Sequence, residues 1–242
     1  MKRNGEVVID LAERIKAAIL AGTFRPGEPL PEAHVIQQFG CSRASAREAL
    51  RLVTHSGLAA KAPNQSYRIV QFDAGDLNEL TSLRLILEQQ AARFAFGQES
   101  MIEGMGTALE HLRTAVANGD RTAAIRANRD FHQAIIDSSG HRRLAQAYLQ
   151  ISDQIEFAFL TLNHLRRSLD RLVPEHETLY ECARTGTPEA FLVELGNHIH
   201  GVLAAPPPQT ERPPTTEMTS LASLQAPDIL EAKSTKVGQL RW

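Results

Sequence analysis

The feature that most constrains this chain is a run of residues, 76–203, in which nothing has the alternating pattern of a β-strand. Apolar residues recur there at intervals of three and four, and turn sequences such as Asn118-Gly119-Asp120 divide the run into segments of helical length. Because such helices can bury their apolar sides against one another, we predict an antiparallel bundle. The six expected helices span residues 76–96, 99–117, 120–138, 142–166, 168–185 and 188–203.

The first of these helices shows the helical period clearly. Its apolar positions Leu80, Leu83, Leu87, Ala91 and Phe94 fall on one stripe, as in an amphipathic helix of a bundle. We therefore expect this stripe to face the core of the bundle.

The first 72 residues are organised differently. Helical patterns over residues 6–21 and 32–39 precede a third helix over about 43–55, for which Ser42 is a good N-cap. The pattern then changes to that of short strands on either side of a turn at Pro63-Asn64. Three helices and a small hairpin predict a winged helix-turn-helix. The expected fold class is thus mainly α, with this unit ahead of the six-helix bundle.

Charge changes along the chain in step with these patterns. Residues 1–72 hold ten Lys or Arg and six Asp or Glu, whereas residues 73–203 hold twelve and eighteen. A basic domain joined to an acidic one favours different partners for the two, although chance surface charge is the alternative. Five prolines in the 17 residues that begin at Ala204 predict a disordered tail over 204–242.

Composition also argues against several classes of protein. No stretch approaches the roughly 18 apolar residues that a membrane span needs, and the N-terminus has no signal-peptide core. The two cysteines, Cys41 and Cys182, make neither a disulfide framework nor a CxxC metal pair. We expect a cytoplasmic protein with reduced thiols and no membrane partner.

The third N-terminal helix carries a row of basic residues. Arg43, Arg47 and Arg51 fall within about 80° of its circumference, and the small Ser45 between them lets the helix approach a surface closely. The helix start, capped by Ser42, offers backbone N–H groups to a phosphate, and guanidinium groups read guanine in the major groove. Alone, such a row is most often a solvated face. Between two other helices and a hairpin it indicates DNA recognition.

Several short motifs in the same region belong together. They are the Arg25-Pro26-Gly27 turn, Leu30 with Glu32, Gly40 with Ser42-Arg43, the run Arg47-Glu48-Ala49-Leu50, and Gly57-Leu58. With them, residues 10–70 resemble the DNA-binding domain of GntR-type bacterial transcription regulators. The resemblance implies a winged helix in which Arg43 and Arg47 contact DNA, with help from the wing.

The remaining candidates for DNA contact lie beside these two arginines or in the wing. The wing departs from the pattern of the family, which often has Arg and Gly where this chain has Gln65 and Ser66. The position after Leu30, often basic or polar, is Pro31. We include Ser42, Ser45, Arg51, Asn64 and Gln65 among the residues expected at the DNA.

Three of the nine histidines can share a site. Asn128 and His132 are one helical turn apart, a spacing able to grip one metal ion, and His176 and His198 lie on two later helices. Asp130 is two residues from His132 and points to another side. By spacing alone, such a set is more often a group of ordinary polar residues than a metal site.

Three segments of the bundle carry a second resemblance. "LRLILEQQAARFA" (83–95), "NRDFHQAIIDSSG" (128–140) and "EHETLYECARTGTPEAFLVELGNHI" (175–199) are similar to the FCD ligand-binding domain of the FadR-like branch of GntR regulators, and six helices suit its VanR-like subgroup. The resemblance implies a divalent metal ion, zinc, nickel or similar, facing a pocket. Matched by motif, its ligands are Asn128, His132, His176 and His198, with Asn128 in place of the more usual Asp.

Arg84 resembles a position of this family that often points into the pocket. There it could pair with a carboxylate of an effector through two parallel hydrogen bonds. The residues alone allow an equal alternative, a surface ion pair with Glu88 four residues on.

These observations together predict a sequence-specific transcription regulator, more specifically a repressor. We expect a homodimer that binds a pseudo-palindromic DNA operator and responds to a small carboxylic acid. The alternative is a helical metalloenzyme that uses the histidines for hydrolysis or oxygen chemistry. Against an enzyme, no carboxylate stands at an obvious general-base spacing to the histidines, and the arginine helix would have no role.

Overall fold

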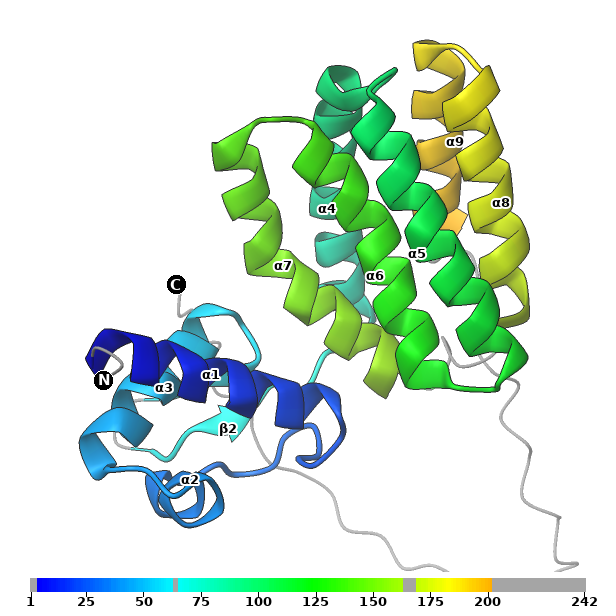
Figure 1. Cartoon of the computed structure of the whole chain (residues 1–242). Coiled ribbons are helices and arrows are strands. Elements are labelled where there is room, and N and C mark those ends of the chain that lie inside the picture. The colour runs from blue at the N-terminus through cyan, green and yellow to red at the C-terminus, as the bar shows by residue number, and fades with distance from the viewer. Residues whose placement is uncertain (1–3, 63–64, 163–168, 202–242) are drawn as a thin grey trace, which may run out of the picture. The chain divides into compact units, whose positions relative to one another are not determined.

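The computed structural model describes residues 4–62, 65–162 and 169–201 (Figure 1). A winged helix-turn-helix comes first in the chain and a helical bundle follows, which confirms the predicted fold class. The N-terminal elements are α1 (Asn4–Leu20), α2 (Glu32–Phe39), α3 (Arg43–His55), β1 (Ala59–Ala60) and β2 (Arg68–Ile69). The bundle comprises α4 (Ala74–Ala95), α5 (Glu99–Ala117), α6 (Arg121–Ser138), α7 (Arg142–Thr161), α8 (Leu169–Thr185) and α9 (Pro188–Gly201).

The winged helix has its own small hydrophobic core. α1 packs along α3, and the side chains of Ile15, Leu50 and Val53 between them are completely buried. β1 and β2 pair antiparallel with Ala59 opposite Ile69. Each strand has two residues, in agreement with the short strands predicted on either side of the turn.

A third segment, residues 28–30, completes the wing, and Pro29 forms an antiparallel bridge with Arg68. The Leu30 N–H donates to the Tyr67 carbonyl, and the Ile69 N–H donates to the Glu28 carbonyl. The connection between α1 and α2 therefore lies against β2, and it ties the start of the helix-turn-helix to the wing.

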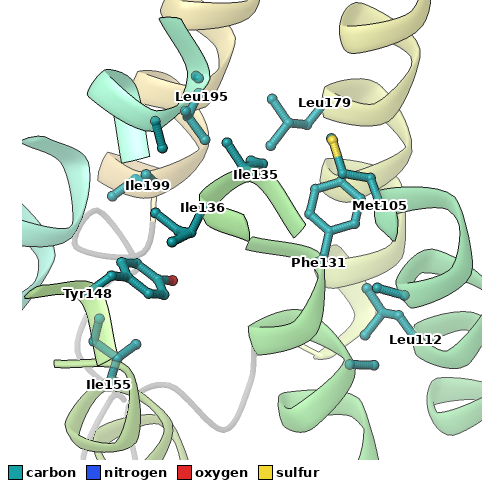
Figure 2. Close-up of a cluster of buried hydrophobic side chains, with 14 of the residues drawn as sticks. Met105, Leu112, Phe131, Ile135, Ile136, Tyr148, Ile155, Leu179, Leu195 and Ile199 are labelled. Atoms are coloured by element: carbon teal, nitrogen blue, oxygen red, sulfur yellow. The ribbon is translucent and has the colours of Figure 1, made fainter. Parts of the chain in front are cut away.

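The bundle is held by apolar side chains from all six of its helices. Figure 2 shows Phe131 of α6 close to Met105 of α5, with Leu179 of α8 and Leu195 of α9 nearby. Tyr148 of α7 is as buried as its apolar neighbours, although it carries a hydroxyl. A buried hydroxyl needs a hydrogen-bond partner, so this residue marks a polar spot in the core.

Two helices of the bundle approach each other very closely. A methyl group built on Gly104 of α5 would lie 2.8 Å from the Cβ of Ala134 of α6. That is too short for two carbon atoms in contact, so the α5–α6 crossing depends on a glycine at this position.

The first helix of the bundle, α4, differs from expectation in the face that it buries. A capping box formed by Asp73 and Asp76 starts the helix. Leu80 and Ala91 are buried as predicted, but Leu83 and Phe94 are exposed. The predicted stripe was therefore wrong in part, because the buried face instead carries polar side chains whose partners lie on other helices.

Some predictions fall on residues outside the described ranges. The tail at 204–242 and Asn64 are among them, so the structure does not bear on them. α7 ends at Thr161 in the described part, short of the predicted 166. No helix among the described residues combines the length and apolar character required to span a bilayer.

Candidate DNA-reading helix and metal centre

The start of α3 is fixed by its cap. Ser42 is extended at φ −72° and ψ 157°, and its Oγ accepts a hydrogen bond of 3.1 Å from the Ser45 N–H. The hydroxyls of Ser42 and Ser45 are also 2.9 Å apart. The predicted cap is thus confirmed, and it sets the direction in which the first turn of α3 faces solvent.

The face of α3 divides as the sequence predicts. Arg43, Arg47 and Arg51 are all exposed. The opposite side of the helix is fully buried and consists of Ala46, Ala49, Leu50 and Val53. The three guanidinium groups therefore form one basic surface on a helix whose other side is locked in the core.

Arg47 differs from its neighbours in being held in place. Its Nε and Nη2 donate to the two carboxylate oxygens of Glu32 on α2, at 3.1 and 3.2 Å. This bidentate pair orients the guanidinium, which remains 59% exposed. Arg51 lies 3.5 Å from Glu48 on its own helix, a weaker and more exposed ion pair. Arg47 is therefore the best oriented of the three.

The wing contributes polar and basic groups near its tip. Gln65 is exposed, and its N–H donates to the Ala62 carbonyl. Lys61 lies over the ring of Tyr67 with its Nζ 4.5 Å from the ring centroid. Arg68 Nη1 donates to the Gly27 carbonyl at 2.6 Å, so this guanidinium is held against the connection between α1 and α2.

The bundle brings three buried imidazoles together, as the motif match predicts. His132 of α6, His176 of α8 and His198 of α9 each offer a ring nitrogen, and the three nitrogens lie within 4.8 Å of one another. The ring centroids of His176 and His198 are 4.5 Å apart. Three histidines whose ring nitrogens are this close can bind the same metal ion.

The hydrogen bonds of the three rings fix where their lone pairs lie. His132 Nδ1 donates to Glu88 Oε2 at 2.7 Å, and His176 Nδ1 donates to the Leu172 carbonyl at 2.7 Å. Both Nε2 atoms therefore carry lone pairs. His198 Nε2 lies 3.1 Å from His132 Nε2. His176 Nε2 and His198 Nδ1 are buried without a hydrogen-bond partner, although buried polar atoms normally have one.

Burial keeps the three imidazoles neutral. It lowers the pKa of His176 to about 3, with a further contribution from the nearby His132. The pKa values of His132 and His198 are also lowered, mainly by burial. Neutral imidazole is the form that binds metal ions, so the protein environment selects the ligand form of all three side chains.

Arg84 and Glu88 form an ion pair inside the bundle, whereas the sequence alternative placed this pair on the surface. Arg84 Nε donates to Glu88 Oε1 at 2.7 Å, and the side chains are 3% and 0% exposed. The Tyr148 hydroxyl donates to the same oxygen at 2.9 Å. Burial by itself would raise the pKa of Glu88, but Arg84 and His132 outweigh it and bring that pKa to about 2.

The remaining candidate ligand, Asn128, is buried one turn before His132 on α6. Together with Arg84 and Tyr148 it lines an internal cavity of about 10 Å³, which is about the size of one water molecule. Asp130 and His200 are exposed, in agreement with their offset from the ligand positions. His141 has a structural role, because its Nδ1 caps α7 by accepting a hydrogen bond from the Leu144 N–H.

Comparison with known proteins gives the family of this chain. Residues 9–69 match the family model "Bacterial regulatory proteins, gntR family", and residues 79–201 match the model of the FCD domain. The chain belongs to the GntR family of bacterial regulators. The match to the gntR model includes α3, and the three histidines lie within the match to the FCD domain.

Individual relatives agree with this assignment. A protein of Bacillus subtilis (strain 168), "Uncharacterized HTH-type transcriptional regulator YdhC", is 29% identical over 180 residues, 73% of this chain and 80% of that one. The "Probable D-xylose utilization operon transcriptional repressor" of Paenarthrobacter nicotinovorans is 24% identical over 200 residues, covering 82% and 88%. The fold matches that of a GntR regulator from Rhodococcus sp. RHA1 with a TM-score of 0.75 at 22% identity, over 81% and 95% of the two chains.

Glu88 contacts the histidines, a role that sequence reasoning missed because it considered this residue only as a surface partner of Arg84. The sequence shows no carboxylate at an obvious general-base spacing to the histidines, but the fold brings Glu88 to 2.7 Å from His132 Nδ1. Its contacts with Arg84, Tyr148 and His132, and its low pKa, leave it ionised and enclosed. It therefore positions His132 rather than accepting a proton from a substrate. Glu88 does not supply the general base that the metalloenzyme alternative requires. The sequence signal for its burial was the spacing of Arg84, Glu88, Ala91 and Ala95. These residues follow one another at intervals of four, three and four, which places them on one face of the helix.

Proposed function

We propose that this GntR regulator is a repressor that acts as a homodimer on a pseudo-palindromic operator. The six helices of its FCD domain favour the VanR-like subgroup of the FadR-like branch. Its two copies of α3 would enter successive major grooves, because a two-fold dimer matches a two-fold DNA site. The observation that supports this most directly is the exposed row Arg43, Arg47 and Arg51 on a helix whose other face is buried.

Within this proposal each candidate residue has a separate task. Arg43 and Arg47, on the first two turns of α3, contact bases, and Arg51 contacts the phosphate backbone. Ser42 and Ser45, at the capped helix start, bind a phosphate. The wing residues Asn64 and Gln65 contact the backbone or the adjacent groove.

We further propose that Asn128, His132, His176 and His198 hold a divalent metal ion such as zinc or nickel. The support is the pair of unpartnered ring nitrogens on His176 and His198, which a cation would satisfy. When bound, such an ion supplies a positive charge that attracts an anionic ligand. The neutral oxygen of Asn128 gives the site one negative charge fewer than an aspartate would, so we expect weaker metal binding than in relatives with Asp.

The effector in this proposal is a small carboxylic acid bound beside the metal site. Arg84 and Tyr148 line the small cavity there and supply hydrogen-bond donors. Because the cavity has room for about one water molecule, a carboxylic acid must widen it and compete with Glu88 for Arg84. Binding would then favour one dimer arrangement over another, and that difference in affinity changes operator occupancy.

A selection of DNA sites tests the central part of the proposal. Purified protein is incubated with a random duplex library, and bound sequences are enriched and read. We expect an inverted repeat with half-sites about one helical turn apart, and affinity that falls steeply with salt. Enrichment of no sequence over the starting library would refute sequence-specific binding.

A ligand screen tests the effector and metal parts separately. Thermal unfolding is followed with a panel of small carboxylates, with and without a chelator, because a ligand that binds the folded state raises the melting temperature. Metal content is measured in the purified protein and in a His132→Ala/His176→Ala variant. Equal metal content in both would place the ion elsewhere.

A further inference from the structure

Glu156 of α7 is a buried acid in the FCD domain with one oxygen that the protein does not satisfy. The residue is 2% exposed. Its Oε2 accepts a hydrogen bond of 2.7 Å from Arg129 Nη1 of α6, but its Oε1 is buried without a hydrogen-bond partner. Arg126 Nε lies 3.7 Å from Oε1, which is too long for a hydrogen bond. Because buried acceptors normally have a partner, Oε1 is available to a hydrogen-bond donor from a ligand.

This oxygen belongs to a residue that lines the internal cavity beside the histidines. Tyr148, Ser152 and Glu156 line that cavity from α7, where a spacing of four residues places them on one face of the helix. The Ser152 hydroxyl donates to the Leu149 carbonyl at 3.4 Å, so its proton is directed at its own helix. Glu156 is therefore the acceptor at one end of a polar row that begins at Tyr148.

The two ends of this row face different groups. Arg84 and Tyr148 both donate to Glu88 Oε1, at 2.7 and 2.9 Å, so their polar atoms lie together. Glu156 instead pairs with Arg129. Tyr148 and Glu156 are eight residues apart on α7, which corresponds to about 12 Å along the helix axis. An effector whose carboxylate is held by Arg84 therefore meets Glu156 with a group remote from that carboxylate.

The charges around Glu156 favour a neutral donor. Arg129 Nη1 lies 2.7 Å from Glu156 and 3.3 Å from Asp153, and Arg126 adds a second guanidinium beside Glu156. The cations already at least match the two carboxylates. A buried ammonium group would bring a further positive charge that must be desolvated, whereas a hydroxyl group donates a hydrogen bond without adding charge.

The size of the cavity makes this donor important for affinity. The cavity of about 10 Å³ has room for about one water molecule, so an effector that widens it displaces any water there. Displacing an ordered water by a group that cannot reproduce its hydrogen bonds lowers affinity. A methylene group beside Glu156 would leave Oε1 unsatisfied, and a hydroxyl group in the same place would satisfy it.

We propose that the effector is a carboxylic acid with a neutral hydroxyl group at the end remote from its carboxylate, and that Glu156 selects it by accepting a hydrogen bond from that hydroxyl. The inference rests on the proposed effector site and adds the residue that discriminates among acids. Such selection is strong, because an acid that lacks the hydroxyl leaves a buried charged oxygen unpaired.

Titration calorimetry on the purified full-length protein tests this selection. Straight-chain acids of about four to six carbons are compared without a hydroxyl group, with one at the carbon next to the carboxylate, and with one at the far end. At the best-fitting length, we expect the terminal-hydroxy acid to bind about tenfold to a hundredfold more tightly than the parent acid. The acid with the adjacent hydroxyl should show no such gain, and the terminal-amino acid should bind more weakly than the terminal-hydroxy acid.

Variants of Glu156 show whether this residue is the cause. Glu156→Met removes the acceptor and should bring the parent and terminal-hydroxy acids to equal affinity. Glu156→Gln retains an acceptor oxygen and should keep part of the preference. The readout is a ratio of two affinities within one variant, so a loss of stability alone does not produce the effect. Glu103→Met, at an exposed position of α5, is the matched control and should keep the full preference.

The possible failures are distinguishable. Wild-type protein that binds acids equally with and without the terminal hydroxyl, or a preference that persists in Glu156→Met, would overturn selection by Glu156 and leave the effector site standing. A terminal-amino acid that binds more tightly than the terminal-hydroxy acid would overturn the neutral donor. Wild-type protein that binds neither these acids nor any member of the wider carboxylate panel would refute the effector site and this inference together.

Discussion

The carboxylate of Glu88 lies 2.7 Å from Nδ1 of His132, inside a protein core that would otherwise exclude a charge. Arg84 and Tyr148 complete the contacts of this carboxylate. The result is that Nε2 of His132 is free of a proton and turned toward the other two histidines. A metal-ligating histidine whose other nitrogen donates to a carboxylate has a fixed orientation and greater basicity.

Replacing Glu88 by Gln should weaken metal binding without removing a ligand. The amide keeps the shape of the side chain but loses the negative charge that holds the His132 N–H, so we expect the affinity for Zn²⁺ to fall about 10- to 100-fold. A competition titration with a chromophoric chelator measures it. Glu103→Gln, on an exposed position, is the matched control, and equal affinities for the two variants would contradict the role given to Glu88.

Arg84→Met should be strongly destabilising. It leaves the Glu88 carboxylate buried without its main counter-charge, and breaking a buried pair from one side costs about 3–5 kcal/mol. Urea unfolding followed by circular dichroism measures the loss. The double variant Arg84→Met/Glu88→Leu removes both charges and should recover much of the stability. A double variant less stable than the single one would show that the pair itself, and not the stranded charge, carries the stability.

Arg47→Ala should reduce affinity for the selected DNA site. A bidentate base contact contributes about 1–3 kcal/mol of discrimination, so the loss should be roughly 5- to 150-fold in the dissociation constant and greatest for sites with the preferred base. Fluorescence anisotropy with labelled duplexes measures it. Arg142→Ala, an exposed arginine of α7, is the control. Unchanged affinity and an unchanged salt slope would mean that α3 does not read DNA through Arg47.

Glu32→Gln tests the orientation of Arg47 separately from its charge. The Glu32 carboxylate holds the guanidinium through two hydrogen bonds, and the amide can replace only part of that contact. We expect the preference for the selected site over a random duplex to fall, while binding to the random duplex stays equal or becomes tighter because one negative charge is gone. The measured quantity is the dissociation constant for the random duplex divided by that for the selected site. A larger ratio in the variant than in the wild type would argue that Glu32 holds Arg47 away from the bases.

Gly104→Ala should destabilise the bundle although alanine favours helices. The helix propensity gain is about 1 kcal/mol, whereas the added methyl group would lie 2.8 Å from the Cβ of Ala134, and such overpacking costs about 1–3 kcal/mol. Thermal unfolding measures the net change. Gly5→Ala in α1 is the matched control, because nothing lies within 4 Å of its new methyl group. Adding Ala134→Gly to Gly104→Ala should restore stability, and failure to do so would place the strain elsewhere.

The sequence was most informative where one local rule decides the structure. The cap at Ser42, the basic face of α3 and the breaks between the helices all follow from short patterns, and the structure agrees with them. The three histidines meet as the motif match predicted. In each case the deciding residues lie within one element or follow a known spacing.

The sequence was misleading on α4, where two faces compete for the core. Leu83 and Phe94 look like core residues, yet the buried side carries Arg84 and Glu88. A periodicity argument counts apolar positions and does not see that a buried charge can be satisfied by residues far along the chain. The partners of Glu88 are 44 and 60 residues away, at His132 and Tyr148.

The two-sided character of α4 has a mechanical consequence. One side of the helix carries Arg84 and Glu88 in the core of the bundle, and the other side carries the exposed Leu83 and Ile86. A helix moves as a rigid rod over short lengths, so a tilt imposed by a ligand on the Arg84 side must appear at Ile86, only two residues away. A change in the core would thereby reach the surface of the domain through a single backbone segment, with no relay of intervening side chains.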